Sequence, residues 1–134
     1  MIVDSSAIIA VLKEEPDAAR FVEALARASV TRMSAGNYVE TAAVVDRNND
    51  PVLSRRLDDL LDAAGVVIEP LTAEHGKIAR QAYRDFGRGS GHSARLNLGD
   101  CFAYALARAT GEPLLFQGDD FAQTDLGSAL DAPG

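Results

Sequence analysis

The sequence predicts one α/β domain, built as a three-layer α/β/α sandwich around a parallel sheet of four or five strands. Short apolar segments that fit strands alternate with longer segments of helical periodicity along the 134 residues. Strands separated by helical crossovers pair in parallel. A chain of this length forms one domain and buries a core without disulfides. We expect the domain to span residues 1–130, with a frayed tail at 131–134.

The first part of the chain reads as strand, helix, helix and strand. Residues 1–4 form a short buried strand that ends at Asp4, and residues 5–14 follow with apolar side chains at helical spacing. Pro16 opens a second helix, because proline is tolerated in a first helical turn. Residues 29–33 form the second strand. The apolar stripe of the second helix comprises Phe21, Val22, Leu25 and Ala28.

The middle of the chain reads as two helices and a strand. Ser34 is the N-cap of a helix that ends near residues 48–49. The pair Asp50-Pro51 starts the next helix, and Gly65 closes it. Residues 66–69 are expected to be a buried strand, stopped by a proline.

The last part reads as helix, loop, helix and strand. Thr72 opens the first of these helices, and residues 87–97 form a loop rich in glycine and serine. A helix over residues 98–110 and a strand over 114–116 complete the domain.

Composition fits a soluble globular protein, with 47% hydrophobic and 25% charged residues. No apolar run reaches the ~18 residues that cross a bilayer, and no basic region precedes the first apolar stretch, so we expect no membrane span and no signal peptide. A single cysteine excludes an internal disulfide and agrees with a cytoplasmic location.

The net charge of −7 argues against a protein that coats nucleic acid non-specifically, which needs a basic surface. It does not argue against an enzyme that cuts nucleic acid. Carboxylates that hold a metal ion count as negative in the formal sum, although the bound ion offsets them locally.

Acidic residues stand at the predicted ends of strands and starts of helices. Asp4 ends the first strand, Asp119 and Asp120 follow the fourth, Asp100 opens the late helix, and Glu40 lies in the helix after the second strand. Sites in open parallel sheets form just beyond the strand C-termini, and Mg²⁺ and Mn²⁺ prefer carboxylate and water oxygens. Because clustered carboxylates repel, their convergence predicts a cation or raised pKa values. A phosphodiester is the expected substrate.

Each acidic residue also has a structural interpretation. Asp4 fits a helix N-cap, and Asp100 suits the dipole of a first helical turn. Glu40 stands one position off an apolar stripe, where a solvated position is the alternative. One of Asp119 and Asp120 is expected in the site and the other as a cap of the following turn, and spacing alone does not choose between them.

Four segments carry a family resemblance: residues 2–7 (IVDSSA), 34–41 (SAGNYVET), 96–107 (LNLGDCFAYALA) and 114–121 (LLFQGDDF). In this order they resemble the motifs of PIN-domain proteins, specifically the VapC toxins of bacterial toxin–antitoxin pairs. Any one motif is a weak signal, but four in order over nearly the whole chain are a strong one.

The resemblance implies a Mg²⁺- or Mn²⁺-dependent endoribonuclease that holds one or two ions and leaves 3′-hydroxyl and 5′-phosphate ends. Its catalytic and metal-binding positions match Asp4, Glu40 and Asp100. The fourth acidic position falls on Asp120, with Asp119 close behind, because the family pattern is glycine, any residue, aspartate, phenylalanine.

The resemblance also implies partners. A cognate VapB-like antitoxin is expected to insert a segment, often with an arginine, towards the acidic site, which would be electrostatically favourable. A homodimer and a toxin–antitoxin hetero-oligomer are expected, with the apolar surfaces of the first two helices and the 51–64 helix as candidate interfaces. Which RNA is cut stays open among tRNA, ribosomal RNA and mRNA, because RNA recognition depends on shape and exposed bases.

Basic residues supply a candidate surface for the substrate. Arg80, Arg84 and Arg88 recur every four residues and form one stripe if the helix persists to Arg88, and Arg95 extends it. Phosphate binding is the functional interpretation, and a solvated helix face is the structural one. By resemblance, Ser6 is the small hydroxyl that touches metal-bound water or phosphate.

A metal ion would activate water and stabilise charge on the scissile phosphate, with Asp100 or Asp120 orienting the attacking water. His75 and His92 are both expected to be solvated, which disfavours a ribonuclease that uses two histidines. Cys101 is expected to pack inward as a small hydrophobe. The aromatic residues expected in the core are Tyr38, Phe102, Tyr104 and Phe121.

Two rival classes remain at the level of sequence. A phosphoaspartate protein also uses acidic residues on a parallel sheet, but the phosphatase type has a second aspartate where Ser6 stands, and the receiver type has a late strand-end lysine, whereas the last lysine here is Lys77. A binding module with structural carboxylates predicts no cleavage and no effect of Mg²⁺ on stability.

Overall fold

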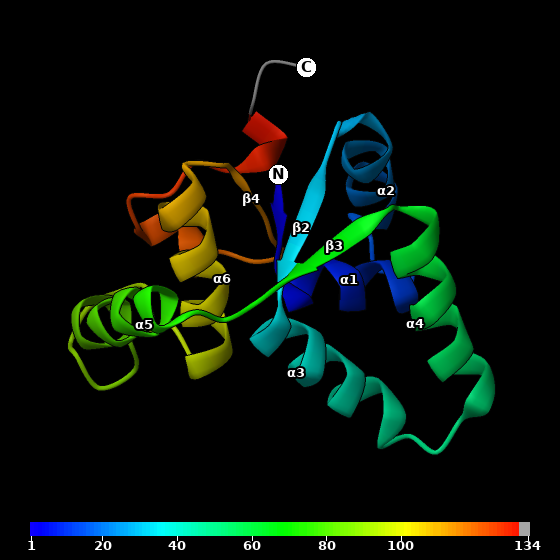
Figure 1. Cartoon of the computed structure of the whole chain (residues 1–134), viewed down its shortest axis with the longest axis horizontal. Coiled ribbons are helices and arrows are strands. Elements are labelled where there is room, and N and C mark those ends of the chain that lie inside the picture. Colours follow the sequence, from blue (N-terminus) through cyan, green and yellow to red (C-terminus); the bar gives the residue numbers. More distant parts are fainter. Residues whose placement is uncertain (132–134) are drawn as a thin grey trace.

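The computed structural model describes residues 1–131, and its centre is a four-stranded parallel sheet (Figure 1). The order of its strands is β3-β2-β1-β4, and each neighbouring pair is parallel. This confirms the predicted parallel sheet, with four strands. The strands are β1 (Ile2–Val3), β2 (Thr31–Ser34), β3 (Val66–Glu69) and β4 (Leu114–Leu115).

Six α-helices and two short 3₁₀ helices complete the part of the chain that the structure describes. The α-helices are α1 (Ser5–Leu12), α2 (Ala18–Arg27), α3 (Ala35–Asp46), α4 (Pro51–Ala63), α5 (Ala73–Phe86) and α6 (Leu98–Thr110). The 3₁₀ helices are η1 (Phe121–Gln123) and η2 (Ala129–Asp131).

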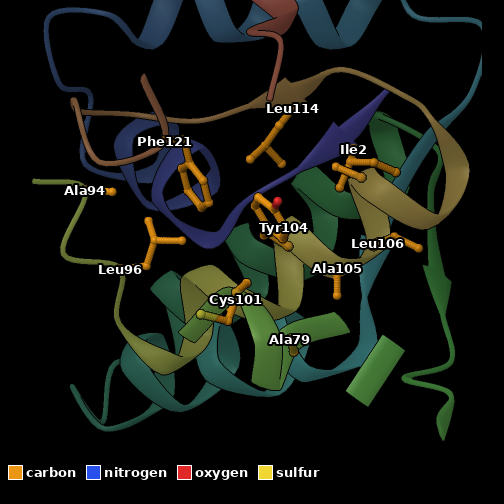
Figure 2. Packing of buried hydrophobic residues seen from close by; sticks show 13 residues of the cluster. Ile2, Ala79, Ala94, Leu96, Cys101, Tyr104, Ala105, Leu106, Leu114 and Phe121 are labelled. Carbon is orange, nitrogen blue, oxygen red and sulfur yellow. The ribbon is translucent and has the colours of Figure 1, made fainter. Parts of the chain in front are cut away.

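Side-chain alternation along the strands divides the interior into two cores. Ile2 and Leu114 belong to the core formed with α5 and α6, which Figure 2 shows from close by. Val3 and Leu115, the next residues, belong to the core formed with α1, α2 and α4. Successive side chains of a strand point to opposite faces of a sheet. The two cores therefore establish the predicted three layers, and Figure 1 shows the two helical groups on either side of the sheet.

The strand order reverses at β1, and open α/β sheets have their ligand crevice at such a switch point. From β1 the chain crosses to β2 and then β3 on one side, whereas β4 pairs with β1 on the other side. The backbone N–H of Asp4 donates to the carbonyl of Leu115 at 2.9 Å, so the ends of β1 and β4 lie together. In open α/β sheets, ligands bind beyond the strand C-termini at such a switch point.

Side-chain caps define where the helices begin. Ser34 accepts from the backbone N–H of Gly36, and Thr72 accepts from that of His75, as the sequence predicts. Asp50 caps α4, and Gly65, with a φ of +63°, follows its last residues. The helix over residues 98–110 is also confirmed, and its N-cap is Asn97.

The boundaries of the first two helices differ from the predicted ones. The first helix ends at Leu12 instead of continuing to Glu14, which adopts a left-handed φ of +53°. The second helix starts at Ala18 rather than Pro16. Val22 is 48% exposed, so it does not belong to the buried stripe; Phe21 and Leu25 alone are fully buried on this helix.

The strand over residues 66–69 is present but is not buried. β3 is the outer strand of the sheet, with Val67 44% and Ile68 43% exposed. Within residues 1–131 its only strand neighbour is β2, so one edge of this strand is unpaired there. The run of apolar residues predicted burial because periodicity alone does not separate a central strand from an outer one.

The predicted frayed tail is tested only at its first residue. Asp131 closes η2, and residues 132–134 lie outside the described part of the chain. Among the residues described, no helix has the length and apolarity to cross a membrane.

Candidate active site

Asp4 is the most deeply buried acidic side chain of the crevice. It is 2% exposed, and its Oδ2 accepts a hydrogen bond from the backbone N–H of Ser6 at 3.0 Å. Its Oδ1 is buried and has no hydrogen-bond partner among the residues that the structure describes. Burial raises the pKa of Asp4 to about 7; hydrogen bonds from Ser6 lower it, and the charges of Asp100 and Glu40 raise it. Asp4 therefore caps α1 and also presents an unsatisfied oxygen, so both interpretations of this residue hold.

Asp100 stands in the first turn of α6, the most buried helix of the domain. Its Oδ2 accepts from the backbone N–H of Asn97 at 2.9 Å, and Asn97 caps the N–H of Asp100 in return. Burial raises the pKa of Asp100 to about 6, the bond from Asn97 lowers it, and the charges of Asp120 and Glu40 raise it. The positive charge of Arg88 lowers it. Asp100 therefore shares one electrostatic environment with Asp120, Glu40 and Arg88.

Glu40 is half-buried on α3 and lies between the segments that carry the two aspartates. Its Oε1 accepts a hydrogen bond from the hydroxyl of Ser5 at 2.8 Å. Its carboxylate also lies against Gly99, where a Cβ would come within 2.5 Å of the Cδ of Glu40. Glu40 thus contacts the residue after Asp4 and the residue before Asp100.

Asp119 and Asp120 are both exposed in the turn after β4. Asp120 is the one whose charge acts on Asp100, and its side chain makes no cap hydrogen bond to η1. The geometry therefore favours Asp120 as the fourth acidic residue.

Ser6 connects two segments at the crevice. Its hydroxyl accepts a hydrogen bond from the backbone N–H of Gln117 at 2.9 Å, so the start of α1 is held against the chain leaving β4. Asp120 follows three residues later. A contact of Ser6 with substrate stays a prediction.

The carboxylates fit a hard divalent cation by their chemistry. Asp4 offers an unpartnered buried oxygen, and Asp4 and Asp100 both have raised pKa values that a cation would lower. Within residues 1–131, however, no three Asp, Glu, His or Cys side chains already form a group that could hold a metal ion together. Mg²⁺ keeps several waters and uses only one or two direct carboxylates in many sites, so a preformed three-ligand shell is not a requirement.

The four arginines do not form one helical stripe. Arg80 and Arg84 are exposed on α5, but this helix ends at Phe86, before Arg88. The helix stops at Gly87, where the backbone takes an extended conformation and a Cβ would clash with the carbonyl of Tyr83. Arg88 instead donates its backbone N–H to Leu96 at 3.0 Å, and its charge acts on Asp100.

Arg95 is exposed in the same loop, with a left-handed φ of +52°. Within residues 1–131, none of the four arginines forms an ion pair. All four are therefore available to a phosphate, and Arg88 is the one that the structure connects electrostatically to the acidic site.

The two histidines, both predicted to be solvated, differ in their surroundings. His75 is half-buried, and His92 packs edge-on against Phe86 with ring centroids 4.9 Å apart. The Nδ1 of His92 accepts from the backbone N–H of Ala94 at 3.0 Å, which fixes the ring within its loop. The prediction was wrong for His92, because its loop packs against Phe86 at the end of α5, whereas the partial burial of His75 does not contradict it.

Cys101 is buried, and burial raises the pKa of its thiol to about 12, with a further contribution from Asp100. It is a packing residue, as predicted. Tyr104 and Phe121 are also core residues, whereas Tyr38 and Phe102 are only partly buried.

Three residues of the site escaped the sequence reasoning: Ser5, Asn37 and Gly99. Asn37 is fully buried, and its Nδ2 donates to the carbonyl of Gly99 at 2.8 Å. The sequence signal of Ser5 and Gly99 is that each stands next to an aspartate of the site, Asp4 or Asp100. Which side chain each one contacts depends on the tertiary fold.

The comparisons with known proteins agree with this geometry. The model of the PIN domain family matches residues 1–126. Ribonuclease VapC28 of Mycobacterium tuberculosis is 55% identical over 131 residues, which cover 98% of each chain.

Two solved structures are similar in fold at low sequence identity. One is Mycobacterium tuberculosis VapC20, described as a toxin that cleaves the Sarcin-Ricin loop, with a TM-score of 0.70 and 19% identity over 93% of this chain and 95% of that one. The other is a toxin–antitoxin complex from Klebsiella pneumoniae, with a TM-score of 0.68 and 16% identity over 90% and 89%. The matched domain and the similarity to VapC28 show that this chain belongs to the PIN-domain family, among the VapC ribonucleases.

Proposed function

We propose that this protein is the toxin of a toxin–antitoxin pair and that it hydrolyses RNA phosphodiester bonds with the help of Mg²⁺ or Mn²⁺. The observation that carries the proposal is that Glu40 contacts the sequence neighbours of both Asp4 and Asp100, near the switch point of the sheet. Burial and mutual repulsion raise the pKa values of both aspartates. A fold gathers acidic groups at such a cost when a cation or substrate uses them.

The residues that would hold one or two ions are Asp4, Glu40, Asp100 and Asp120, with Asp119 as the weaker candidate for the fourth position. A bound divalent ion would lower the pKa of a water molecule and stabilise charge on the scissile phosphate. Asp100 or Asp120 is the proposed group that orients the attacking water, and the charge of Asp120 reaches Asp100. Attack on phosphorus would leave 5′-phosphate and 3′-hydroxyl ends.

Substrate binding is assigned to four arginines of α5 and of the loop that follows it. Arg80, Arg84, Arg88 and Arg95 are exposed and free of ion pairs within the described residues, and guanidinium groups bind phosphate in a bidentate manner. Arg88 is expected to contribute most, since its charge reaches Asp100. The side chain of Ser6 is the proposed contact to water or phosphate at the floor of the crevice.

A VapB-like antitoxin is the proposed partner, in accordance with the family and with the solved toxin–antitoxin complex of similar fold. The proposal also includes a homodimer, a hetero-oligomer with the antitoxin, and a cytoplasmic location. An apolar hollow between α2 and α4 supports an interface on the predicted helices. It is lined by Val22, Leu25, Ala26, Ala28, Leu60, Ala63 and Ala64.

The proposal is tested by incubating the purified protein, freed of partner, with total cellular RNA in Mg²⁺, in Mn²⁺ and in chelator. Asp4→Asn and Asp100→Asn are compared with Asp58→Asn, a matched control on the exposed face of α4. We expect discrete cleavage that needs metal, is lost in the two site variants and persists in the control; mapping the new ends identifies the substrate.

Cleavage that is equal in all variants would place the activity elsewhere. Well-folded protein that cuts no RNA in any metal, and whose stability does not respond to Mg²⁺, would favour the rival interpretation as a binding module.

A further inference from the structure

We propose that Gly99, assisted by Ser5, is a positioning residue that sets the location of the Glu40 carboxylate between Asp4 and Asp100. The inference rests on the proposed function, since it assigns Gly99 a role in the same acidic site. Its basis is a steric fact. The absent side chain of Gly99 leaves the space that the carboxylate of Glu40 occupies.

A side chain at position 99 would approach Glu40 more closely than atoms do in ordinary packing. A Cβ on Gly99 would lie within 2.5 Å of the Cδ and Oε1 of Glu40 and would be nearer still to Oε2. The backbone of Gly99 lies outside the left-handed region, so its conformation alone does not require glycine. The requirement for glycine therefore comes from Glu40.

Gly99 itself is held in place from two sides. The Nδ2 of the fully buried Asn37 donates to its carbonyl at 2.8 Å. The capping box of Asn97 and Asp100 fixes the turn of α6 in which it lies. If a methyl group were added, the backbone would resist and the carboxylate, at the end of a flexible side chain, would move.

Ser5 holds the same carboxylate from the opposite segment. Its hydroxyl donates to the Oε1 of Glu40 at 2.8 Å and lies at 3.2 Å from the carbonyl of Asn37. Glu40 is thus positioned by the neighbour of each aspartate. A displacement of its carboxylate would change the spacing of the acidic group while the fold persists.

The decisive variant is Gly99→Ala, compared with Gly76→Ala. Gly76 is also helical, on α5, and a Cβ there meets nothing within 4 Å. Gly76→Ala replaces a poor helix former without a clash, so it should melt at the wild-type temperature or above it. In Gly99→Ala the displacement of Glu40 offsets this gain, and a thermal melt shows whether the fold persists. We expect Gly99→Ala to bind Mn²⁺ in calorimetric titration at least ~10-fold more weakly and to lose RNA cleavage in parallel, whereas Gly76→Ala matches wild type.

A double variant separates positioning from a general structural effect. Added to Glu40→Ala, Gly99→Ala should cause no further loss of Mn²⁺ affinity, because the group that it displaces is gone. Ser5→Ala, which adds no bulk, should weaken Mn²⁺ binding in the same direction and keeps the test decisive if Gly99→Ala does not fold.

The outcomes separate the two proposals. Wild-type Mn²⁺ affinity and cleavage in Gly99→Ala would overturn the inference and leave the proposed function standing, as would an undiminished effect in the Glu40→Ala background or no effect of Ser5→Ala. A wild-type protein that binds Mn²⁺ but cuts no RNA, with binding weakened by Gly99→Ala, would support the inference and overturn the function. Absence of Mn²⁺ binding by the wild type would overturn both.

Discussion

The hydroxyl of Ser6 accepts a hydrogen bond from the backbone N–H of Gln117, 111 residues later in the chain, at 2.9 Å. This bond joins the start of α1 to the segment that leaves β4, at the place where the strand order reverses. It also places the turn that carries Asp120 relative to Asp4. The position of the fourth acidic residue therefore depends on a side chain at the other end of the chain.

Ser6→Ala is expected to reduce RNA cleavage about 10-fold or more while lowering the free energy of unfolding by only ~1 kcal/mol, the typical contribution of one hydrogen bond. The variant leaves the N–H of Gln117 without its acceptor and loosens the Asp120 turn. Ser6→Thr keeps the hydroxyl and should retain most activity. Denaturant melts and single-turnover cleavage measure the two effects; equal loss in both variants would point to packing rather than the hydrogen bond.

The metal-free protein is expected to lose stability as pH rises from about 4 to 7. The pKa of Asp4 is raised to about 7 and that of Asp100 to about 6, so the folded state keeps protons that the unfolded chain has already released. In that window the folded state binds more protons, and stability falls with increasing pH. For Asp4 the loss is on the order of 2–4 kcal/mol, and above pH 7 it is complete.

Asp4→Asn should flatten most of this pH dependence and make the metal-free protein more stable at pH 8. Chemical denaturation between pH 4.5 and 8 measures the slope. Excess Mg²⁺ should restore stability to the wild type at pH 8, where the carboxylates are ionised, and should have little effect on the variant. A wild-type stability that rises across this window would contradict the burial argument.

Much of the fold could be predicted from the sequence because local signals agree with the tertiary structure. Ser34, Thr72 and Asp50 are placed correctly as helix caps, since capping depends on backbone groups two or three residues away. The open edge of β3 and the end of α5 at Phe86 could not be predicted in this way. The first depends on which strands pair, and the second on how closely Gly87 approaches Tyr83.

The residues of the site also fall into those that the sequence predicts and those that it does not. Asp4 and Asp100 could be found from strand-end and helix-start positions together with family motifs, and in the structure the charge of Glu40 acts on both. The partners of Glu40 could not be found, because Ser5 and Gly99 lie 35 and 59 positions away, at sequence numbers 5 and 99 against 40. Small residues carry no chemical signal of their own, and their role appears only as a contact.

Asp120→Asn is expected to impair cleavage far more than Asp119→Asn. The charge of Asp120 acts on Asp100, whereas Asp119 is not among the groups that do so. Both side chains are exposed, so neither variant should lower the melting temperature by more than a degree or two. Parallel measurements of kcat and of Mn²⁺ affinity decide the assignment, and a larger loss in Asp119→Asn would transfer the fourth position to that residue.

Arg88→Ala is expected to change both RNA binding and the pH dependence of cleavage, whereas Arg80→Ala should change RNA binding alone. If both arginines bind phosphate, each variant should weaken RNA binding in chelator and reduce the slope of log affinity against log salt by about 0.7 for a single strand. Of these two arginines, Arg88 is the one whose charge lowers the pKa of Asp100, so Arg88→Ala and not Arg80→Ala should shift the acidic limb of the pH–rate profile upwards. Arg80 lies on the exposed face of α5 and serves as the matched control. An unchanged acidic limb in Arg88→Ala would show that Asp100 does not govern that limb or that Arg88 does not reach it when RNA is bound.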